Sequence, residues 1–209
     1  MPPMLRSWVT VAVLALTLVG VFAPAASQAA GDAQRGKQLG YTCLGCHGIE
    51  DYKNVYPTYS VPKLVGQHPE YLVAALKGYR SKDRSHGTMY AQASSLSDKD
   101  IEDIAAYLAG AVLAPEAPSA GAAPPKVTEL CVACHGTNGV GITADYPTLA
   151  GQHADYLERA LLEYKKGDRK NPVMATFIGQ LSDVEIKTIA GYYATQRPAL
   201  KTVLRKNWL

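Results

Sequence analysis

The feature that most constrains this chain is a five-residue pattern, Cys-x-x-Cys-His, which occurs twice. The first copy ends at His47 and the second at His135, with an offset of 88 residues between them. All four cysteines of the chain, Cys43, Cys46, Cys131 and Cys134, lie in these two copies. The chemistry that the pattern serves therefore occurs once in each half of the chain and uses every thiol.

Three common uses of paired cysteines fit this pattern poorly. Structural disulfides do not explain a histidine directly after each pair. Ribbon-like zinc sites usually separate their pairs by about 15 to 20 residues, whereas Cys46 and Cys131 are much further apart. A thioredoxin-like dithiol belongs to a βαβ pattern, and this sequence is helical in its periodicity.

Covalent attachment of haem gives the pattern a mechanical reason. Two cysteines three positions apart on a helical turn project to one side, so their sulfurs can form thioethers with the two vinyl groups on one edge of the macrocycle. The next residue then presents its imidazole to the iron. The sequence therefore predicts two covalently bound haem c groups, with His47 and His135 as iron ligands.

The first 29 residues are typical of a secretory signal. Arg6 precedes an apolar run over residues 8–22, and Ser27 and Ala29 fit the minus-three and minus-one positions of a cleavage site. The run is shorter than the roughly 20 apolar residues that span a bilayer, and an uncleaved anchor is the alternative. We expect the mature chain to begin near Ala30 and to lie outside the cytoplasm. Loss of Arg6 lowers the formal net charge from +3 to +2, which argues against nucleic acid as a partner.

The similarity between the two halves extends well beyond the cysteines. Segment 62–109 aligns with segment 147–194 at a constant offset of 85 residues, and the shared positions include Gly-Gln-His, Tyr-Leu, Asp-Arg and Leu-Ser-Asp. The offset is larger at the cysteine motif, so the first copy carries a three-residue insertion. The chain is therefore predicted to contain two homologous domains in tandem.

We expect domain 1 to span residues 30–110 and domain 2, with a C-terminal tail, residues 127–209. Segment 111–126 between them is rich in Ala and Pro and is typical of a semi-extended linker. Each domain then has only about 80 residues, a size at which a hydrophobic core alone is marginal. A covalently held haem would complete that core.

Both domains show helical rather than alternating periodicity. Apolar residues recur at i, i+3, i+4 and i+7 in segments 72–79 and 157–164. The same pattern returns after Ser97 and Ser182, which are predicted N-caps, and Glu185 completes a capping box in the second copy. The predicted fold class is all-α.

A haem iron held by one imidazole has a second axial position, and its ligand should recur in both domains. Met89 and Met174 recur, and they are the only methionines that remain after removal of the predicted signal. We expect both in irregular segments between two helices. His68 and His153 are the alternative pair, although each precedes a helix start, where a polar side chain commonly caps the helix or contacts solvent. Thioether ligation predicts the higher reduction potential.

Two further pairs recur near the predicted iron sites. Pro62 and Pro147 each have a carbonyl that can accept a hydrogen bond from the proximal histidine and fix its ring; the alternative is a turn with no role at the iron. Arg84 and Arg169 are candidates for contacts with haem propionates, because a guanidinium suits bidentate recognition of carboxylates. The alternative for each arginine is a surface ion pair with the Asp before it.

In its combination of motifs the chain resembles the dihaem cytochrome c4 family over residues 32–195. The motifs are Cys-x-x-Cys-His-Gly, Pro-x-Leu-x-Gly-Gln, the methionine and the Leu-Ser-Asp helix start, each present in two tandem class I cytochrome c domains. The resemblance implies a periplasmic, often membrane-associated electron carrier between a quinol-oxidising complex and a terminal oxidase. It also implies His/Met ligation at both irons and domains packed about a pseudo-twofold axis.

Two other functions compete with this carrier role. A dihaem peroxidase or thiosulfate-oxidising enzyme needs an open or unusually ligated iron, and two matched methionines leave neither iron free. The closer alternative is the cytochrome subunit of a flavocytochrome or another dehydrogenase complex.

Two segments depart from the repeat. Residues 49–61 replace the glycine-containing loop of the second copy, and the tail after residue 195 has no counterpart in domain 1. Domain 2 is the more basic domain, which raises peripheral association with a phospholipid surface or an acidic partner, with a solvated surface as the alternative. Its basic residues include Arg159, Lys165, Lys166, Arg169, Lys170, Lys201, Arg205 and Lys206.

Overall fold

The computed structural model describes residues 31–110, 123–197 and 200–203. Helices make up its regular structure, and within these ranges the only β-type pairings are isolated bridges. The all-α fold class is therefore confirmed. The predicted signal, residues 111–122 of the predicted linker, and Arg205 and Lys206 of the basic tail lie outside the described residues.

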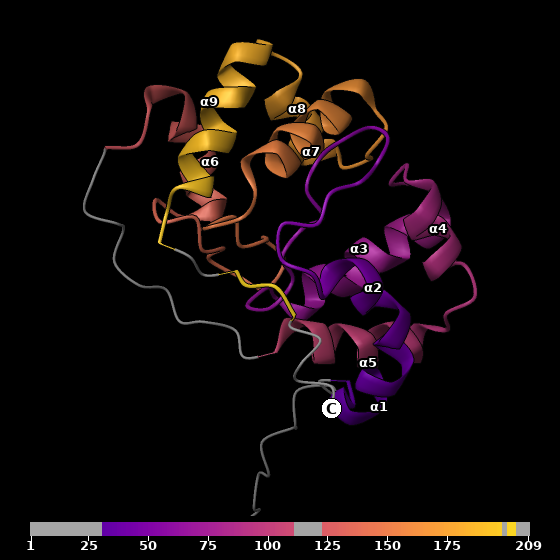
Figure 1. Cartoon of the computed structure of the whole chain (residues 1–209). Coiled ribbons are helices and arrows are strands. Elements are labelled where there is room, and N and C mark those ends of the chain that lie inside the picture. The colour runs from indigo at the N-terminus through magenta and orange to yellow at the C-terminus, as the bar shows by residue number, and fades with distance from the viewer. Residues whose placement is uncertain (1–30, 111–122, 198–199, 204–209) are drawn as a thin grey trace, which may run out of the picture.

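The helices fall into two groups that follow the sequence repeat (Figure 1). Domain 1 contains α1 (Ala33–Leu39), α2 (Leu44–His47), α3 (Pro69–Ser81), α4 (Gly87–Ala93) and α5 (Asp98–Ala109). Domain 2 contains α6 (Glu129–His135), α7 (Ala154–Lys166), α8 (Pro172–Ile178) and α9 (Asp183–Ala194). Short 3₁₀ helices precede α2 and α6, at Gly40–Cys43 and Lys126–Thr128.

The last helix of each domain begins at the predicted cap. Ser97 caps α5 and Ser182 caps α9, and each serine shares a reciprocal capping box with an acidic residue three positions later. The box with Glu185 was predicted, and Asp100 forms the equivalent box in domain 1. Loss of such a cap typically destabilises a helix by about 1 kcal/mol. The caps fix the residues at which α5 and α9 start.

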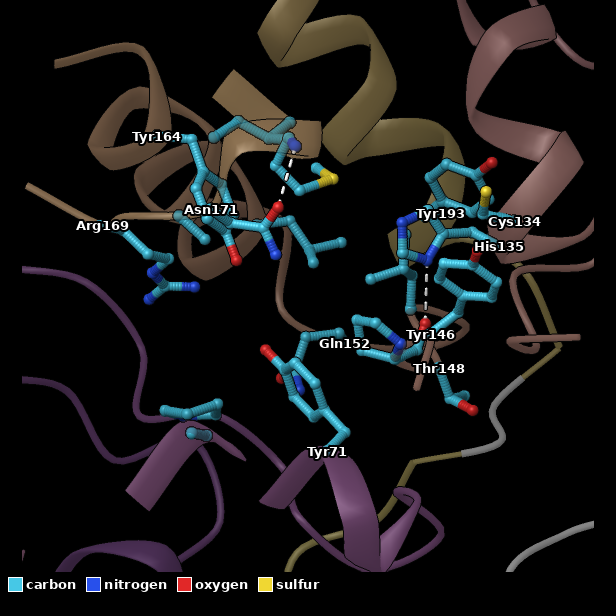
Figure 2. A pocket seen from close by; sticks show the side chains of 18 of the residues that line it. Tyr71, Cys134, His135, Tyr146, Thr148, Gln152, Tyr164, Arg169, Asn171 and Tyr193 are labelled. Carbon is cyan, nitrogen blue, oxygen red and sulfur yellow. Dashed lines mark hydrogen bonds between the residues drawn. The ribbon is translucent and has the colours of Figure 1, made fainter. Parts of the chain in front are cut away.

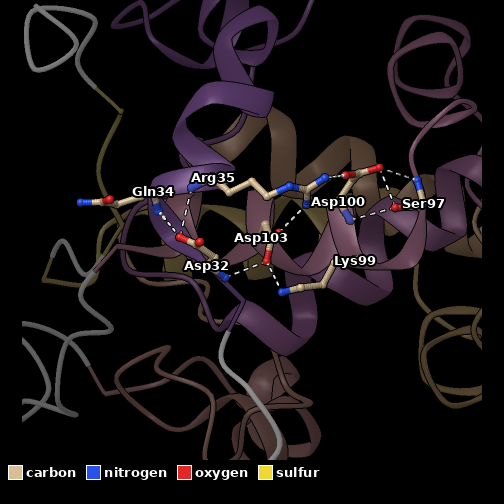
Figure 3. Close-up of polar contacts among 7 residues, drawn as sticks. All are labelled: Asp32, Gln34, Arg35, Ser97, Lys99, Asp100 and Asp103. Atoms are coloured by element: carbon tan, nitrogen blue, oxygen red, sulfur yellow. Dashed lines mark hydrogen bonds and ion pairs between the residues drawn. The ribbon is translucent and has the colours of Figure 1, made fainter.

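A buried carboxylate fastens α1 to α5 (Figure 3). Asp103 is fully buried and accepts hydrogen bonds from the Asp32 backbone N–H at 2.6 Å, Lys99 Nζ at 2.6 Å and Arg35 Nη1 at 2.5 Å. At Gly36, an added Cβ would lie 1.8 Å from the carbonyl oxygen of Asp103. Only glycine therefore permits this close contact between the first and last helices of domain 1.

The Asp103 contacts predict a pH-dependent stability of domain 1. The hydrogen bond from Lys99, with those from Arg35 and the Asp32 backbone, lowers the pKa of Asp103 to about 2, against roughly 3.9 for an unfolded Asp. Because the folded-state pKa is the lower one, the stabilisation is present above pH ~4 and is lost as the pH falls through about 2. Asp103→Asn should lower stability at neutral pH and flatten the pH dependence in that window.

Urea unfolding of the holoprotein, followed by circular dichroism at a series of pH values, measures this effect. Glu102→Gln, on the same helix, is the matched control. An unchanged pH profile in the Asp103→Asn variant would show that this carboxylate does not stabilise the domain.

Two glutamines join the domains through reciprocal hydrogen bonds. The side-chain amide of Gln67 accepts from the Thr148 backbone N–H at 2.9 Å and donates to the Thr148 carbonyl at 3.0 Å. The amide of Gln152 makes the same pair of bonds with the backbone of Lys63, both at 3.0 Å. Gln152 and Lys63 are the repeat equivalents of Gln67 and Thr148. The predicted pseudo-twofold relation between the domains is therefore present.

A second reciprocal contact surrounds Arg84 and Arg169, which occupy equivalent positions in the repeat. The Ser85 N–H donates to the Asp168 carbonyl at 2.8 Å, and the Lys170 N–H donates to the Asp83 carbonyl at 2.7 Å. These bonds enclose an isolated antiparallel bridge between Arg84 and Arg169. The axis that relates the domains thus passes close to this bridge.

The described part of the C-terminal tail returns to domain 1. Val65 and Lys201 exchange backbone hydrogen bonds of 3.0 and 2.9 Å, and Val203 packs into the core of domain 1. The tail, which we expected as an appendage of domain 2, therefore ties the two domains together.

Candidate haem sites

Each domain contains a cavity lined by the residues of its cysteine motif. Cavity 1, of about 160 Å³, is lined by Cys43, Cys46, His47 and Met89, among others. Cavity 2, of about 450 Å³, is lined by the equivalent residues of domain 2 and is shown in Figure 2. These equivalents are Cys131, Cys134, His135 and Met174. The fold thus brings the cysteines, histidine and methionine of each repeat to one cavity.

The two motif histidines are oriented by proline carbonyls. His47 Nδ1 lies 2.9 Å from the Pro62 carbonyl oxygen, and His135 Nδ1 lies 3.0 Å from that of Pro147. Because a carbonyl only accepts, Nδ1 carries the proton and Nε2 keeps its lone pair. Burial lowers the pKa of both histidines, so both are neutral at pH 7. Each imidazole is therefore prepared to bind a metal through Nε2.

The motif cysteines, all four of which lie among the described residues, form no disulfide with one another. Burial raises the pKa of Cys43 and of Cys131, so these groups are neutral rather than reactive thiolates. The disulfide alternative therefore has no support in the structure.

Both methionines lie in short helices, so the expectation of irregular segments is wrong. Met89 is in α4 and Met174 in α8, each seven residues long. The residue three positions earlier caps each helix: His86 Nδ1 accepts from the Met89 N–H at 3.2 Å, and Asn171 Oδ1 accepts from the Met174 N–H at 3.1 Å. Seven residues are too few for periodicity to reveal a helix.

The alternative histidines occupy a different place. His68 and His153 are the N-cap residues of α3 and α7, and neither lines a cavity. Neither side chain makes a capping hydrogen bond. Instead, their backbone N–H groups donate to Gln67 and Gln152 at the domain boundary. Of the two recurring pairs, Met89 and Met174 line the cavities, whereas His68 and His153 do not.

The paired arginines are buried between the two cavities. Arg84 and Arg169 are 7% and 5% exposed and line both cavities, so the surface ion-pair alternative is wrong. Arg84 Nη2 donates to the Tyr71 hydroxyl at 2.7 Å, and Arg169 Nη2 lies 3.1 Å from Glu163 Oε2. Arg169 Nε is buried with no hydrogen-bond partner among the described residues. A buried, unpaired guanidinium donor fits a bound anion.

Comparison with known proteins supports what the geometry indicates. The family model described as Cytochrome c matches residues 33–111 and 126–196. Over 187 residues the chain is 33% identical to cytochrome c4 of Pseudomonas aeruginosa, an alignment that covers 79% of this chain and 89% of that relative. The chain belongs to the cytochrome c4 family.

Two other similar proteins extend this comparison. The crystal structure of reduced recombinant cytochrome c4 from Pseudomonas stutzeri matches 80% of this chain and all of that chain, with a TM-score of 0.62 and 29% identity. A thiosulfate dehydrogenase electron acceptor from Stutzerimonas stutzeri is 34% identical over 170 residues, covering 73% of this chain and 77% of that relative.

As a cytochrome c4 family member, the chain is an electron carrier with two haem c groups and is not an enzyme. The described residues fit this cofactor: each cavity offers two thiols for thioethers, a neutral imidazole, and buried guanidinium donors for carboxylates. When bound, each haem supplies a one-electron ferric/ferrous couple. The two cysteines and the histidine of each motif would hold the group, and the buried arginines would contact its carboxylates.

Sequence reasoning missed the tyrosines that surround the arginines. The Arg84 guanidinium lies 5.4 Å from the Tyr71 ring and 5.2 Å from the Tyr79 ring, and Arg169 lies 6.0 Å and 5.3 Å from Tyr156 and Tyr164. Burial raises the pKa of Tyr156 to about 12, so its phenol stays neutral at physiological pH. Tyr71 and Tyr79 recur as Tyr156 and Tyr164 at the repeat offset of 85 residues. This recurrence was the signal in the sequence that could have identified them.

Proposed function

We propose that the protein is a periplasmic carrier that takes electrons from a quinol-oxidising complex and passes them towards a terminal oxidase. Residues 1–29 are the export signal in this proposal, and domains 30–110 and 127–209 each hold one haem. Met89 and Met174 are the sixth iron ligands. The observation that supports the proposal most is the presence of a histidine and a methionine at both cavities, since two closed irons suit outer-sphere electron transfer.

A second candidate function is that of acceptor for a periplasmic dehydrogenase. The similarity to a thiosulfate dehydrogenase electron acceptor supports it. Both functions use the same two closed sites and differ only in the donor. Within the part of the chain that the structure describes, no helix could span a membrane.

Stopped-flow mixing distinguishes the two donors. The oxidised holoprotein is mixed separately with a reduced quinol-oxidising complex and with a thiosulfate dehydrogenase plus thiosulfate, and haem reduction is followed by absorbance. The carrier proposal predicts fast reduction by the quinol-oxidising complex and oxidation of the reduced protein by terminal-oxidase membranes. Fast reduction by the dehydrogenase alone would establish the second function instead.

The two cavities differ at their mouths, which indicates where a partner docks. Leu130, Val173 and Phe177 line cavity 2 and are 69%, 57% and 44% exposed. Their repeat equivalents in domain 1 are polar, and two of these, Thr42 and Gln92, share a hydrogen bond of 2.9 Å. Exposed apolar side chains that lie together are typical of the centre of a docking surface. We therefore place partner contact at the mouth of cavity 2.

The double substitution Val173→Thr with Phe177→Gln tests this placement. It introduces the residues found at the equivalent positions of domain 1, Thr88 and Gln92. We expect the second-order rate constant with the physiological partner to fall by about tenfold, the equivalent of roughly 1.4 kcal/mol of contact energy. Val184→Thr is the control, because Val184 is 76% exposed but lines neither cavity. Equal rates for the double variant and the wild type would place docking elsewhere.

A further inference from the structure

Each cavity is completed by side chains from the other domain. Four positions near α3 in domain 1 have repeat equivalents near α7 in domain 2. The four residues of each domain line the cavity of the other domain. Cavity 1 receives Tyr156, Arg159, Glu163 and Arg169 from domain 2. Cavity 2 receives Tyr71, Ala74, Gly78 and Arg84 from domain 1.

The two sets differ at two of the four positions. Domain 2 presents the ion pair Arg159–Glu163 to cavity 1, whereas domain 1 presents Ala74 and Gly78 to cavity 2. Glu163 is 5% exposed, and its two carboxylate oxygens contact Arg159 Nε at 2.8 Å and Arg169 Nη2 at 3.1 Å. A charged group therefore stands beside cavity 1 at a position that is glycine beside cavity 2.

The buried arginines Arg84 and Arg169 line both cavities, so their positive charges do not distinguish one cavity from the other. The other charges that line the cavities lie closer to solvent. Cavity 2 is also lined by Lys63, Asp83, Asp145 and Lys170. The side chains of Asp83 and Lys170 are 50% and 68% exposed, and Asp145 is exposed. Water screens such charges. Among the described residues, Glu163 is the only buried carboxylate that lines either cavity.

We propose that Glu163 sets the two haems at different reduction potentials by acting across the domain boundary. Its negative charge favours the ferric over the ferrous state of the haem held at Cys43 and Cys46, and so lowers that potential. The side chain of Arg159 carries the opposite charge but is 33% exposed, so solvent screens it more. A single electron then resides preferentially in domain 2, whose apolar mouth is the proposed docking surface.

Glu163→Gln in the full holoprotein tests this inference. A spectroelectrochemical titration gives both potentials, and haem NMR resonances followed through the same titration assign each potential to its domain. We expect the domain 1 potential to rise, the domain 2 potential to change less, and the gap between them to narrow. Glu158→Gln, a carboxylate on the same helix that lines neither cavity, should change neither potential. Glu163→Asp should restore part of the gap.

A reciprocal variant keeps the test independent of any damage to the α7 ion pairs. Gly78→Glu places a carboxylate beside cavity 2, where the nearest atoms to the added Cβ are Arg84 Cγ and Cδ, on a flexible side chain, at 3.2 Å. We expect the domain 2 potential to fall. An unchanged gap in Glu163→Gln, or a larger shift in domain 2 than in domain 1, would overturn the inference.

The inference rests on the two haem sites of the proposed function and not on the donor. It concerns potentials measured in the isolated protein, so failure of the quinol route in stopped-flow mixing leaves it untouched. Conversely, equal potentials in the wild type would remove the inference and leave the carrier role in place.

Discussion

Replacing Cys131 and Cys134 by alanine is expected to remove one haem and to unfold most of domain 2. Without the covalent bonds the haem is not retained, and the cavity of about 450 Å³ in that domain is left unfilled. At about 24 cal/mol per Å³ of unfilled cavity, the upper limit of the loss is roughly 10 kcal/mol, which is comparable with the whole stability of a small domain. Mass spectrometry should show one haem instead of two, and circular dichroism should show about half of the helix signal lost.

The mirror variant, Cys43→Ala with Cys46→Ala, is the matched comparison. It should lose the other haem and unfold domain 1 while domain 2 keeps its spectrum. Because Gln67 and Gln152 bond across the boundary, the surviving domain should also unfold at lower urea concentration than in the wild type. If either variant retains two haems and full helicity, the cysteines do not hold the cofactor.

Replacing Met174 by alanine is expected to open the sixth coordination position in domain 2 and to lower the potential of that haem. Loss of a thioether ligand removes the stabilisation of the ferrous state that methionine provides. The weak far-red absorption band of a sulfur-ligated ferric haem should lose about half of its intensity. Met89→Ala should have the equivalent effect in domain 1, and the double variant should lack the band.

Substitution of the alternative histidines is the control for this prediction. His68→Ala and His153→Ala should leave the far-red band unchanged, because neither residue lines a cavity. Loss of the band in a histidine variant, with no change in the methionine variants, would reverse the assignment of the sixth ligand.

Features that recur within a few residues were predictable from the sequence. The cysteine motifs, the apolar stripes of α3 and α7 and the caps at Ser97 and Ser182 depend on local spacing, and the structure places all of them as the spacing indicates. The repeat also predicted two domains of one kind. Local spacing therefore predicted α3, α5, α7 and α9 and the residues that meet at each cavity, but not the short helices α4 and α8.

Features that depend on the contact between domains were not predictable in the same way. Periodicity says nothing about Gln67 reaching Thr148, or about Arg84 being buried by tyrosines rather than exposed beside Asp83. The tail segment that pairs with Val65 has no repeat equivalent from which to infer its place. The difference between Glu163 and Gly78 is visible in the sequence, but its consequence depends on the fold, which places each residue at the cavity of the opposite domain.

Addition of carbon monoxide to the fully reduced native protein tests the central claim of two closed iron sites most directly. If a histidine and a methionine hold each iron, the visible absorption spectrum should be the same before and after the gas is added. A carbon monoxide spectrum at either haem would show an open iron, and would contradict a protein that only carries electrons.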